Sequence, residues 1–239
     1  MPNDVPSQNA ATLVLLPGLH GTGNLFRPLT DRLPRDIPYQ IVAYPTDQRL
    51  SIGGLACRVA DRLPPGPVVV LAESFSGLVA LELLAQKRHT IQGVIFCAAF
   101  ARTPHPLLRG PVRRLTLPGR WLQLLPGPLL RAFALGRHAD PRLTMSLRRA
   151  LVEVAPAVLA QRLRLIAGAD FRMDGSFAVP CHYLQAGRDR LVRPRSARWF
   201  AHHFVPFHLH RLDGPHLLLQ ARPRRCARLI ASICRAWQS

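Results

Sequence analysis

The stretch that decides the fold is VVVLAESFSG, residues 68–77. Its first five residues are apolar without alternation, which is typical of a strand that is buried on both faces of a parallel sheet. Ser74 follows this strand almost at once, and residues 75–87 have helical spacing, with leucines along one side. A sharp strand-to-helix turn exposes the hydroxyl of a serine at its tip and is typical of a catalytic nucleophile. The stretch therefore predicts a parallel sheet with Ser74 as a nucleophile at its edge.

The turn needs small residues two positions before and two positions after the serine, because the helix packs closely on the strand there. Ala72 and Ser76 meet this need, although glycine is usual at both positions, and Gly77 adds further room. A similar string in an arbitrary sequence is more often a turn or a helix cap. The strand before it and the amphipathic helix after it favour the catalytic interpretation. Ser76 is the weaker nucleophile because it would lie in the first turn of the helix.

Strands and helices alternate outward from this stretch. The pattern predicts strands at residues 12–16, 40–43, 93–98, 179–186 and 207–212, and helices at 50–63, 195–204 and 223–237. Apolar strands that alternate with helices indicate an α/β fold, with a mostly parallel sheet covered by helices on both faces. We expect residues 11–100 and 171–239 to form this core, and residues 1–10 to be a disordered lead-in.

Residues 101–170 break the alternation. Prolines recur between short leucine- and arginine-rich stretches, and no strand pattern occurs in this span. A span of this length is too long for a plain loop, so we expect a helical cap inserted into the core. Its apolar side chains either pack on the core or line an acyl pocket; they are Leu107, Leu108, Leu115, Trp121, Leu122, Leu124, Leu125, Leu129 and Phe133.

A glycine-rich loop, LLPGLHGTG at residues 15–23, follows the first strand. Backbone N–H groups in such a loop can point at a developing negative charge and stabilise it. We expect the N–H groups of Leu19 and Phe75 to form this oxyanion hole. The N–H of Thr22 is the alternative to that of Leu19, which is preferred because the Pro-Gly pair before it directly abuts the strand. The loop lacks the lysine of a P-loop and the G-x-G-x-x-G spacing, which speaks against phosphate binding.

A serine nucleophile needs a general base, and the base needs a carboxylate to orient it. Asp189 follows the strand predicted at 179–186, and His216 lies in the tight loop LDGPHLLL after the last predicted strand. Both therefore fall at the carboxyl ends of strands, where ligands bind in such sheets. The other carboxylates and histidines in this half of the chain are weaker candidates by position: Asp170, Asp174, Asp213, His202, His203, His208 and His210. His20 is expected to line the pocket.

The composition is that of a globular chain, with 239 residues, 48% apolar and 19% charged. No apolar run has the length that spans a bilayer, so no stable membrane insertion is expected. The five cysteines form no C-x-x-C pair, which indicates neither a disulfide framework nor a zinc site, and a cytoplasmic location is the simplest expectation.

The formal net charge is +19, and Lys87 is the only lysine. Such a charge favours an anionic partner: nucleic acid, a membrane surface or an acidic carrier protein. It is also what a biased composition rich in Arg, Ala, Leu and Pro produces without any role in binding. The arginines are not interleaved with aromatic residues, so nucleic acid is not expected as a partner.

With these residues assembled, the chain resembles the α/β-hydrolase superfamily from about residue 13 to residue 237. The strings that carry the resemblance are LLPGLHGTGNLF, VVLAESFSG, YLQAGRDRLV and LDGPHLLLQARP. The resemblance implies a catalytic triad of Ser74, Asp189 and His216, oxyanion donors at Leu19 and Phe75, and a helical cap at 101–170. The sequence departs from the family pattern at the two elbow positions without glycine and at Pro-Gly in place of His-Gly in the oxyanion loop.

A serine nucleophile implies hydrolysis of an ester or thioester, because the dehalogenases and epoxide hydrolases of this fold carry aspartate instead. No cofactor or metal is expected. The family includes an enzyme that removes a methyl ester from a carrier-bound acyl chain, so an acidic carrier protein is a possible partner. Cap arginines could face such a carrier: Arg109, Arg113, Arg114, Arg131, Arg148 and Arg149. The alternatives are a non-catalytic relative that binds ligands and a nucleic-acid-binding protein.

Overall fold

A computed structural model describes residues 11–87, 89–105, 119–136 and 139–237. A six-stranded sheet runs through the described chain in the order β2-β1-β3-β4-β5-β6, and every neighbouring pair is parallel. The expected α/β architecture is therefore confirmed. The strands are β1 (Thr12–Leu16), β2 (Tyr39–Ile41), β3 (Val68–Glu73), β4 (Ile91–Cys97), β5 (Cys181–Ala186) and β6 (Phe207–Leu212).

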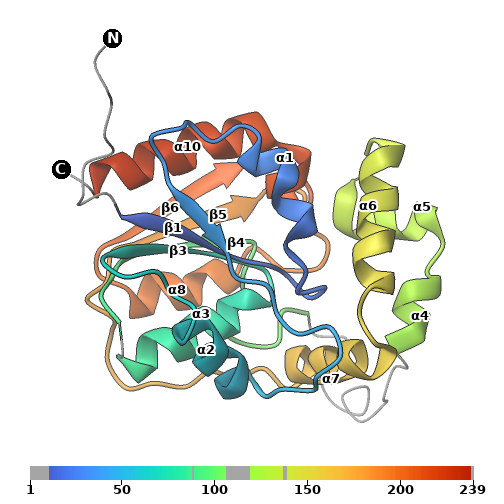
Figure 1. The fold of residues 1–239 in the computed structure, drawn as a ribbon, viewed down its shortest axis with the longest axis horizontal. Helices are drawn as coiled ribbons and strands as arrows, with labels where there is room; N and C mark the ends of the chain where they lie inside the picture. The colour runs from blue at the N-terminus through green and yellow to red at the C-terminus, as the bar shows by residue number, and fades with distance from the viewer. Residues whose placement is uncertain (1–10, 88, 106–118, 137–138, 238–239) are drawn as a thin grey trace.

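Helices cover both faces of this sheet (Figure 1). One face carries α2 (Ile52–Ala60), α3 (Ser76–Gln86) and α8 (Ser196–His203), and the other carries α1 (Arg27–Thr30), α9 (Leu218–Ala221) and α10 (Pro223–Ala236). The 3-10 turn η1 (Gly23–Phe26) leads into α1. The short helices η1, α1 and α9 were not expected from the sequence, because segments of about four residues are too short for helical periodicity to show.

The central strand β3 shows why the sheet forms. All six of its residues are buried. Val68, Val70 and Ala72 belong to the apolar core under α2, α3 and α8, whereas Val69 and Leu71 belong to the core under α1, α9 and α10. Successive side chains of a strand point to opposite faces, so an uninterrupted apolar run is what a strand between two helical layers needs. The same strand therefore fixes the position of the turn that follows it.

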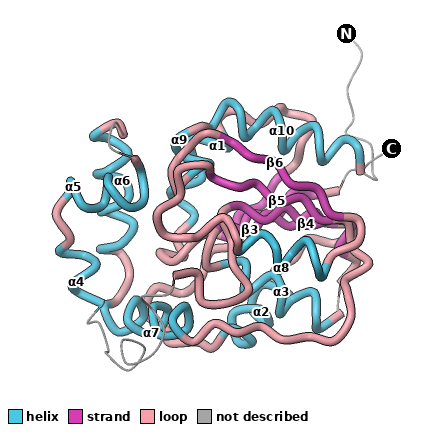
Figure 2. Tube along the Cα trace, turned by 180° about the vertical axis from the view of Figure 1, so that it is seen from behind, coloured by secondary structure: helices cyan, strands magenta, loops and turns pink. Residues whose placement is uncertain are grey.

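Between β4 and β5 the described chain is mostly helical. Its elements are α4 (Gly119–Leu124), α5 (Gly127–Leu130), the π-helical turn η4 (Arg131–Leu135), α6 (Pro141–Val152) and α7 (Pro156–Ala167). Helices α4, α5 and α6 stand beside the sheet rather than on either face (Figure 2), whereas Leu165 and Ile166 of α7 pack against the core under α2, α3 and α8. The helices between β4 and β5 share a small apolar core with Leu25 and Leu217 of the sheet domain. That this insertion acts as a cap over residues 101–170 stays a prediction.

Four of the apolar side chains that were expected to pack on the core or to line an acyl pocket are exposed and stand outside the apolar cores, so a role in a pocket stays a prediction: Trp121, Leu124, Leu129 and Phe133. Leu122 and Leu125 pack against the small core of the insertion. Leu107, Leu108 and Leu115, like Arg109, Arg113 and Arg114 and the predicted lead-in at 1–10, lie outside the described residues. Among the helices that the structure describes, none has the length and apolar character needed to cross a membrane.

Gly77, in the first turn of α3, is expected to tolerate no side chain. A Cβ there would lie 2.7 Å from the Cβ of Ala99 and 3.3 Å from the backbone of Phe100. We expect Gly77→Ala to lower the free energy of unfolding by about 1–3 kcal/mol, because the helix would have to move away from the loop after β4. Urea unfolding followed by circular dichroism measures this change.

The matched control is Gly53→Ala in α2. A Cβ at Gly53 would have Glu82 Oε1 as its nearest neighbour, at 3.7 Å, which is ordinary contact. Gly53→Ala should raise the free energy of unfolding by up to about 1 kcal/mol, because alanine favours the helix more than glycine does. Equal changes in the free energy of unfolding for the two variants would show that close packing at the turn does not require glycine at position 77.

Candidate active site

Ser74 lies at the tip of a strand-to-helix turn. β3 ends at Glu73 and α3 begins at Ser76, and Ser74 has a φ of +52°. This left-handed conformation is uncommon for residues other than glycine and is held only where the surroundings enforce it. Here the N–H of Ser74 donates to the carbonyl of Cys97 over 2.9 Å, and its carbonyl accepts from the N–H of Gly77 over 2.9 Å. The turn is therefore tied to β4 on one side and to the helix on the other.

A chain of two hydrogen bonds joins Ser74 to His216 and Asp189. The distance from Ser74 Oγ to His216 Nε2 is 2.8 Å, and that from His216 Nδ1 to Asp189 Oδ2 is also 2.8 Å. The three side chains come from the loops that follow β3, β6 and β5, so the carboxyl edge of the sheet collects them. The structure thus brings together the three residues that the sequence selected, in the arrangement of a nucleophile, a base and an orienting carboxylate.

The loop after β5 prepares Asp189 for this contact. Asp189 Oδ1 accepts hydrogen bonds from the backbone N–H groups of Leu191 and Val192, each over 2.8 Å. One carboxylate oxygen therefore holds the loop in place, and the other is left for the imidazole. Because Asp189 accepts at Oδ2, the neutral His216 carries its proton on Nδ1 and presents a bare Nε2 to the serine hydroxyl.

Two of the competing carboxylates have other partners. Asp170 pairs with Arg172 over 2.7 Å and with Arg102 over 3.4 Å, and Asp213 pairs with Arg188 over 2.8 Å. All of these pairs are exposed, whereas the Asp189 and His216 side chains are almost completely buried. Burial and the absence of bulk water make the Asp189–His216 contact the stronger electrostatic interaction.

The electrostatics of the site favour a positive charge on His216. Burial acts to lower the pKa of this imidazole, but the charge of Asp189, the hydrogen bond to Asp189 and the charge of Glu73 together raise the pKa above its ordinary value of 6.5. A base with a raised pKa accepts a proton from a hydroxyl more readily. The price is that a larger share of His216 is protonated, and inactive as a base, at mildly acidic pH.

Glu73 is a residue that the sequence analysis did not single out. Its carboxyl group is fully buried directly before the nucleophile, and burial raises its pKa, while the Gln220 side chain, the charge of His216 and the backbone of Gly18 act in the opposite direction. Neither carboxylate oxygen makes a side-chain hydrogen bond of standard geometry within the described residues. The available sequence signal was an acidic residue between an apolar strand and the serine.

The backbone of the loop after β1 distinguishes Leu19 from Thr22, the two candidates for the oxyanion donor that would act beside Phe75. The N–H of Thr22 is already used, because it donates to His20 Nδ1 over 3.2 Å. Within the part of the chain that the structure describes, no hydrogen bond from the N–H of Leu19 or of Phe75 is found. These two groups remain available to a ligand, which favours Leu19 over Thr22 as the partner of Phe75.

His20 is buried within the same loop. Burial, followed by the charge of Arg162, lowers its pKa to about 4, and a backbone contact with Thr22 opposes this shift. His20 is therefore neutral at physiological pH. Its Nδ1 accepts from the N–H of Thr22, so it acts on the loop itself.

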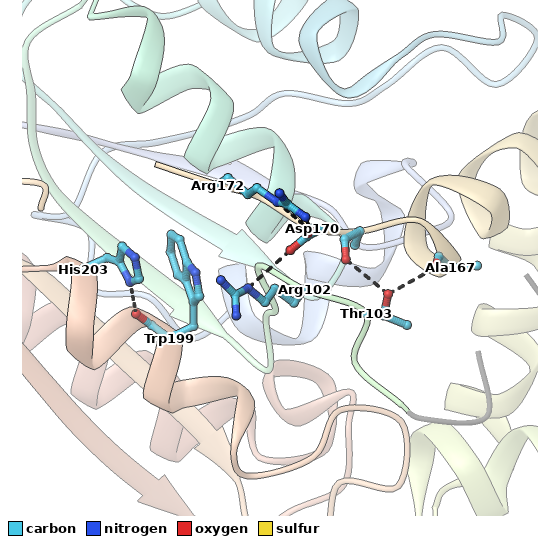
Figure 3. Close-up of polar contacts among 8 residues, drawn as sticks. Arg102, Thr103, Ala167, Asp170, Arg172, Trp199 and His203 are labelled. Atoms are coloured by element: carbon cyan, nitrogen blue, oxygen red, sulfur yellow. Dashed lines mark hydrogen bonds and ion pairs between the residues drawn. The ribbon is translucent and has the colours of Figure 1, made fainter. Parts of the chain in front are cut away.

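A separate cleft of about 530 Å³ lies between the loop after β4 and helix α8. Figure 3 shows four of its lining residues, Arg102, Thr103, Trp199 and His203, with the Trp199 and His203 rings stacked. Asp170, which pairs with Arg102 and Arg172, lies next to them. Arg195 and Arg198 also line it, and neither forms an ion pair within the described residues. None of Ser74, Asp189 and His216 lines this cleft, so it is a basic surface distinct from the serine site.

No group of three or more His, Cys, Asp or Glu side chains in the described ranges is arranged to hold a metal ion. All five cysteines are free thiols, and four of them are buried. Burial raises the pKa of Cys181, Cys226 and Cys234, which keeps them protonated as small apolar side chains.

Comparisons with known proteins found a matching family model and similar solved structures. Residues 6–229 match the model of the Alpha/beta hydrolase family. No curated protein matches the sequence significantly. Among solved structures, the RedJ thioesterase from the prodiginine biosynthetic pathway in Streptomyces coelicolor is similar, with 22% identity, coverage of 96% of this chain and 91% of that chain, and a TM-score of 0.70.

Two further structures are similar over nearly their whole length. The type II thioesterase BorB from the borrelidin biosynthetic cluster has 22% identity, coverage of 95% of this chain and 94% of that chain, and a TM-score of 0.70. A thermophilic esterase from Thermogutta terrifontis has 16% identity, coverage of 96% and 91%, and a TM-score of 0.77. At these identities the likeness shows a shared fold.

Proposed function

Since the chain belongs to the alpha/beta hydrolase family, we propose that it is a serine hydrolase that cleaves a carboxylic ester or thioester through an acyl-enzyme on Ser74. The observation that carries the proposal is the continuous hydrogen-bonded chain from Ser74 through His216 to Asp189. The thioesterases and the esterase among the similar structures support the same reaction class.

The reaction follows from the positions of these groups. His216 Nε2 removes the proton of Ser74 as Oγ attacks the carbonyl carbon, and Asp189 stabilises the imidazolium that forms. The negative charge that develops on the carbonyl oxygen accepts hydrogen bonds from the N–H groups of Leu19 and Phe75. His216 then returns the proton to the leaving alcohol or thiol. In the second half of the reaction, water attacks the acyl-enzyme with His216 again as base.

We further propose that the acyl group is delivered on an acidic carrier protein. The net charge of +19 favours an acidic partner. The cleft with Arg195 and Arg198 is the docking surface that we propose, because it combines a hollow with arginines that have no carboxylate partner within the described residues. Among the cap arginines, Arg148 is less suited to this role, because its guanidinium donates to the carbonyls of Gln123 and Leu125.

The first experiment measures hydrolysis of p-nitrophenyl esters from acetate to palmitate, of short free thioesters and of the same acyl groups on an acidic carrier protein. We expect reaction with a fluorophosphonate probe at Ser74 and a higher kcat/KM for the carrier-bound thioester than for the free one. The advantage should fall as salt is added, since the attraction between exposed charges is screened.

Arg195→Glu with Arg198→Glu should remove most of the carrier advantage and leave hydrolysis of the small esters unchanged. Arg224→Glu with Arg228→Glu on α10 is the matched charge control, since both residues are exposed and the net charge changes by the same amount. Loss of the advantage in all variants alike would mean that total charge, and not this cleft, attracts the carrier. A wild-type protein that cleaves nothing and resists the fluorophosphonate would overturn the proposed reaction in favour of a non-catalytic binding protein.

A further inference from the structure

Arg162 is a buried arginine on helix α7 of the insertion. Only 2% of its surface is exposed. Within the described residues it forms no ion pair with a carboxylate; its guanidinium is held instead by backbone oxygens. Nη1 donates to the carbonyls of Leu19 and His20, each over 2.9 Å, and Nη2 donates to the carbonyl of Pro45 over 2.8 Å. Burying a charge without a partner of opposite charge is costly, so such an arrangement needs a function or a strong structural reason.

The two carbonyls of Leu19 and His20 belong to the loop that carries the expected oxyanion donor. The N–H of Leu19 is available to a ligand, while the carbonyl of the same residue is fixed by the guanidinium. A peptide group is rigid, so the N–H of Leu19 turns together with the carbonyl of Gly18, which accepts from the N–H of Gly21 over 2.9 Å. Arg162 holds the carbonyls of Leu19 and His20, which lie inside the turn closed by Gly18 and Gly21, and it thereby restricts the turn that sets the direction of this N–H.

The chain is adapted to this contact at Gly21. This residue has a φ of +73°, and a Cβ there would lie only 2.4 Å from Arg162 Nη1. Its carbonyl accepts from the N–H of Tyr44 over 2.8 Å, and its N–H donates to the carbonyl of Gly18 over 2.9 Å. The glycine thus lets the guanidinium approach the loop backbone and keeps the turn closed.

Tyr44 and Ser76 support the loop from the other side. The guanidinium carbon of Arg162 lies 5.6 Å from the centre of the Tyr44 ring, within the range of a cation–π interaction. The Tyr44 hydroxyl is 2.5 Å from Ser76 Oγ, and Ser76 in turn donates to the carbonyl of Pro17. The carbonyls of residues 17–21 are therefore each held by a donor, whereas the Leu19 N–H between them has no hydrogen-bond partner among the described residues.

We propose that Arg162 is a positioning residue that holds the oxyanion loop in its donating geometry and so couples helix α7 of the insertion to the serine site. The inference rests on the proposed serine-hydrolase function. This positioning role differs from a purely structural role because it acts on the transition state. When Arg162 is replaced, the site should bind the charged intermediate more weakly but the substrate equally well.

The test uses Arg162→Met and Arg162→Lys in the full-length protein, with Arg164→Met on the exposed side of the same helix as control. Lysine keeps the charge but offers a single ammonium in place of a planar fork that spans three carbonyls. We expect Arg162→Met to lower kcat about 100-fold with KM within about threefold, because misplacement of a catalytic group by about 1 Å has an effect of that order. Arg162→Lys should fall between Arg162→Met and wild type, and the affinity for a boronic acid should drop together with kcat.

Hydrogen–deuterium exchange gives a readout that does not need activity. The amides of Gly21, Thr22 and Tyr44 should exchange faster in Arg162→Met than in wild type or Arg164→Met, while the exchange of β3 and β4 is unchanged. If the wild type has no hydrolase activity but the exchange differs as expected, the proposed reaction fails and the positioning role stands. Folded variants with wild-type kcat, boronic acid affinity and loop exchange would overturn the positioning role. It is equally overturned if neither variant folds, because Arg162 is then required for the fold as a whole.

Discussion

Replacement of Ser74 by alanine is expected to lower kcat for ester hydrolysis by a factor of about 10⁴ or more, since losses of this size follow the removal of a serine nucleophile. Without Oγ no acyl-enzyme can form, and the hydrogen bond to His216 Nε2 is lost. The remaining activity would come from the oxyanion donors and from water. Steady-state kinetics with a short p-nitrophenyl ester measures the loss, and mass spectrometry shows whether the fluorophosphonate adduct disappears.

The control for this variant is Ser146→Ala, which changes an exposed serine on α6. It should keep wild-type kcat and probe labelling. Should Ser74→Ala retain more than a tenth of the activity, or should the probe label a peptide with Ser76 but without Ser74, the assignment of the nucleophile is wrong.

Replacement of Asp189 by asparagine is expected to lower kcat by a factor of about 10³–10⁴. The asparagine amide can donate to His216 Nδ1 and so favour the tautomer with the proton on Nε2, which cannot accept a proton from Ser74. The variant also loses the negative charge that raises the pKa of His216. In the pH profile of the variant, the residual activity should therefore rise at a lower pH than the activity of the wild type does.

In the wild type the corresponding limb of kcat/KM should lie above pH 6.5, because the free base is the active form and its pKa is raised. Asp213→Asn is the matched control, since Asp213 is an exposed carboxylate that pairs with Arg188 in the neighbouring loop. It should change neither kcat nor the pH limb. An Asp189→Asn variant with nearly full activity, or with a limb moved to higher pH, would contradict the role of Asp189 as the orienting carboxylate.

The sequence was sufficient to predict the sheet and the residues at its carboxyl edge. Strand β3 is predicted by an apolar run that is followed by a turn. The loop after β5 carries Asp189 and the loop after β6 carries His216, the carboxylate and the base that a serine nucleophile needs. Because parallel strands end at the same edge, the order along the chain was enough to infer that Ser74, Asp189 and His216 meet. For the strands only the exact ends differ, as for β5, which begins after Pro180 at Cys181.

Other features depend on contacts that have no local signal. Arg162 stands among many arginines in a helix, and its partners at Leu19 and His20 lie 143 and 142 positions away. Glu73 could be seen beside the serine, but its burial against Gln220 depends on how α9 packs. The preference for Leu19 over Thr22 is supported by the hydrogen bond from the N–H of Thr22 to the His20 side chain, which the sequence does not reveal. Side-chain partners of this kind follow from tertiary packing rather than from spacing.

The separation of Ser74 and His216 by 142 positions has a consequence for biosynthesis. A ribosome exposes the nucleophile long before the base, and α10, which covers one face of the sheet, emerges after both. A nascent chain that ends before His216 thus carries an exposed apolar face and lacks the base that its serine needs. The proposed hydrolytic activity should appear only after His216 and α10 have emerged and packed on the sheet, so a shorter nascent chain should not hydrolyse acyl groups.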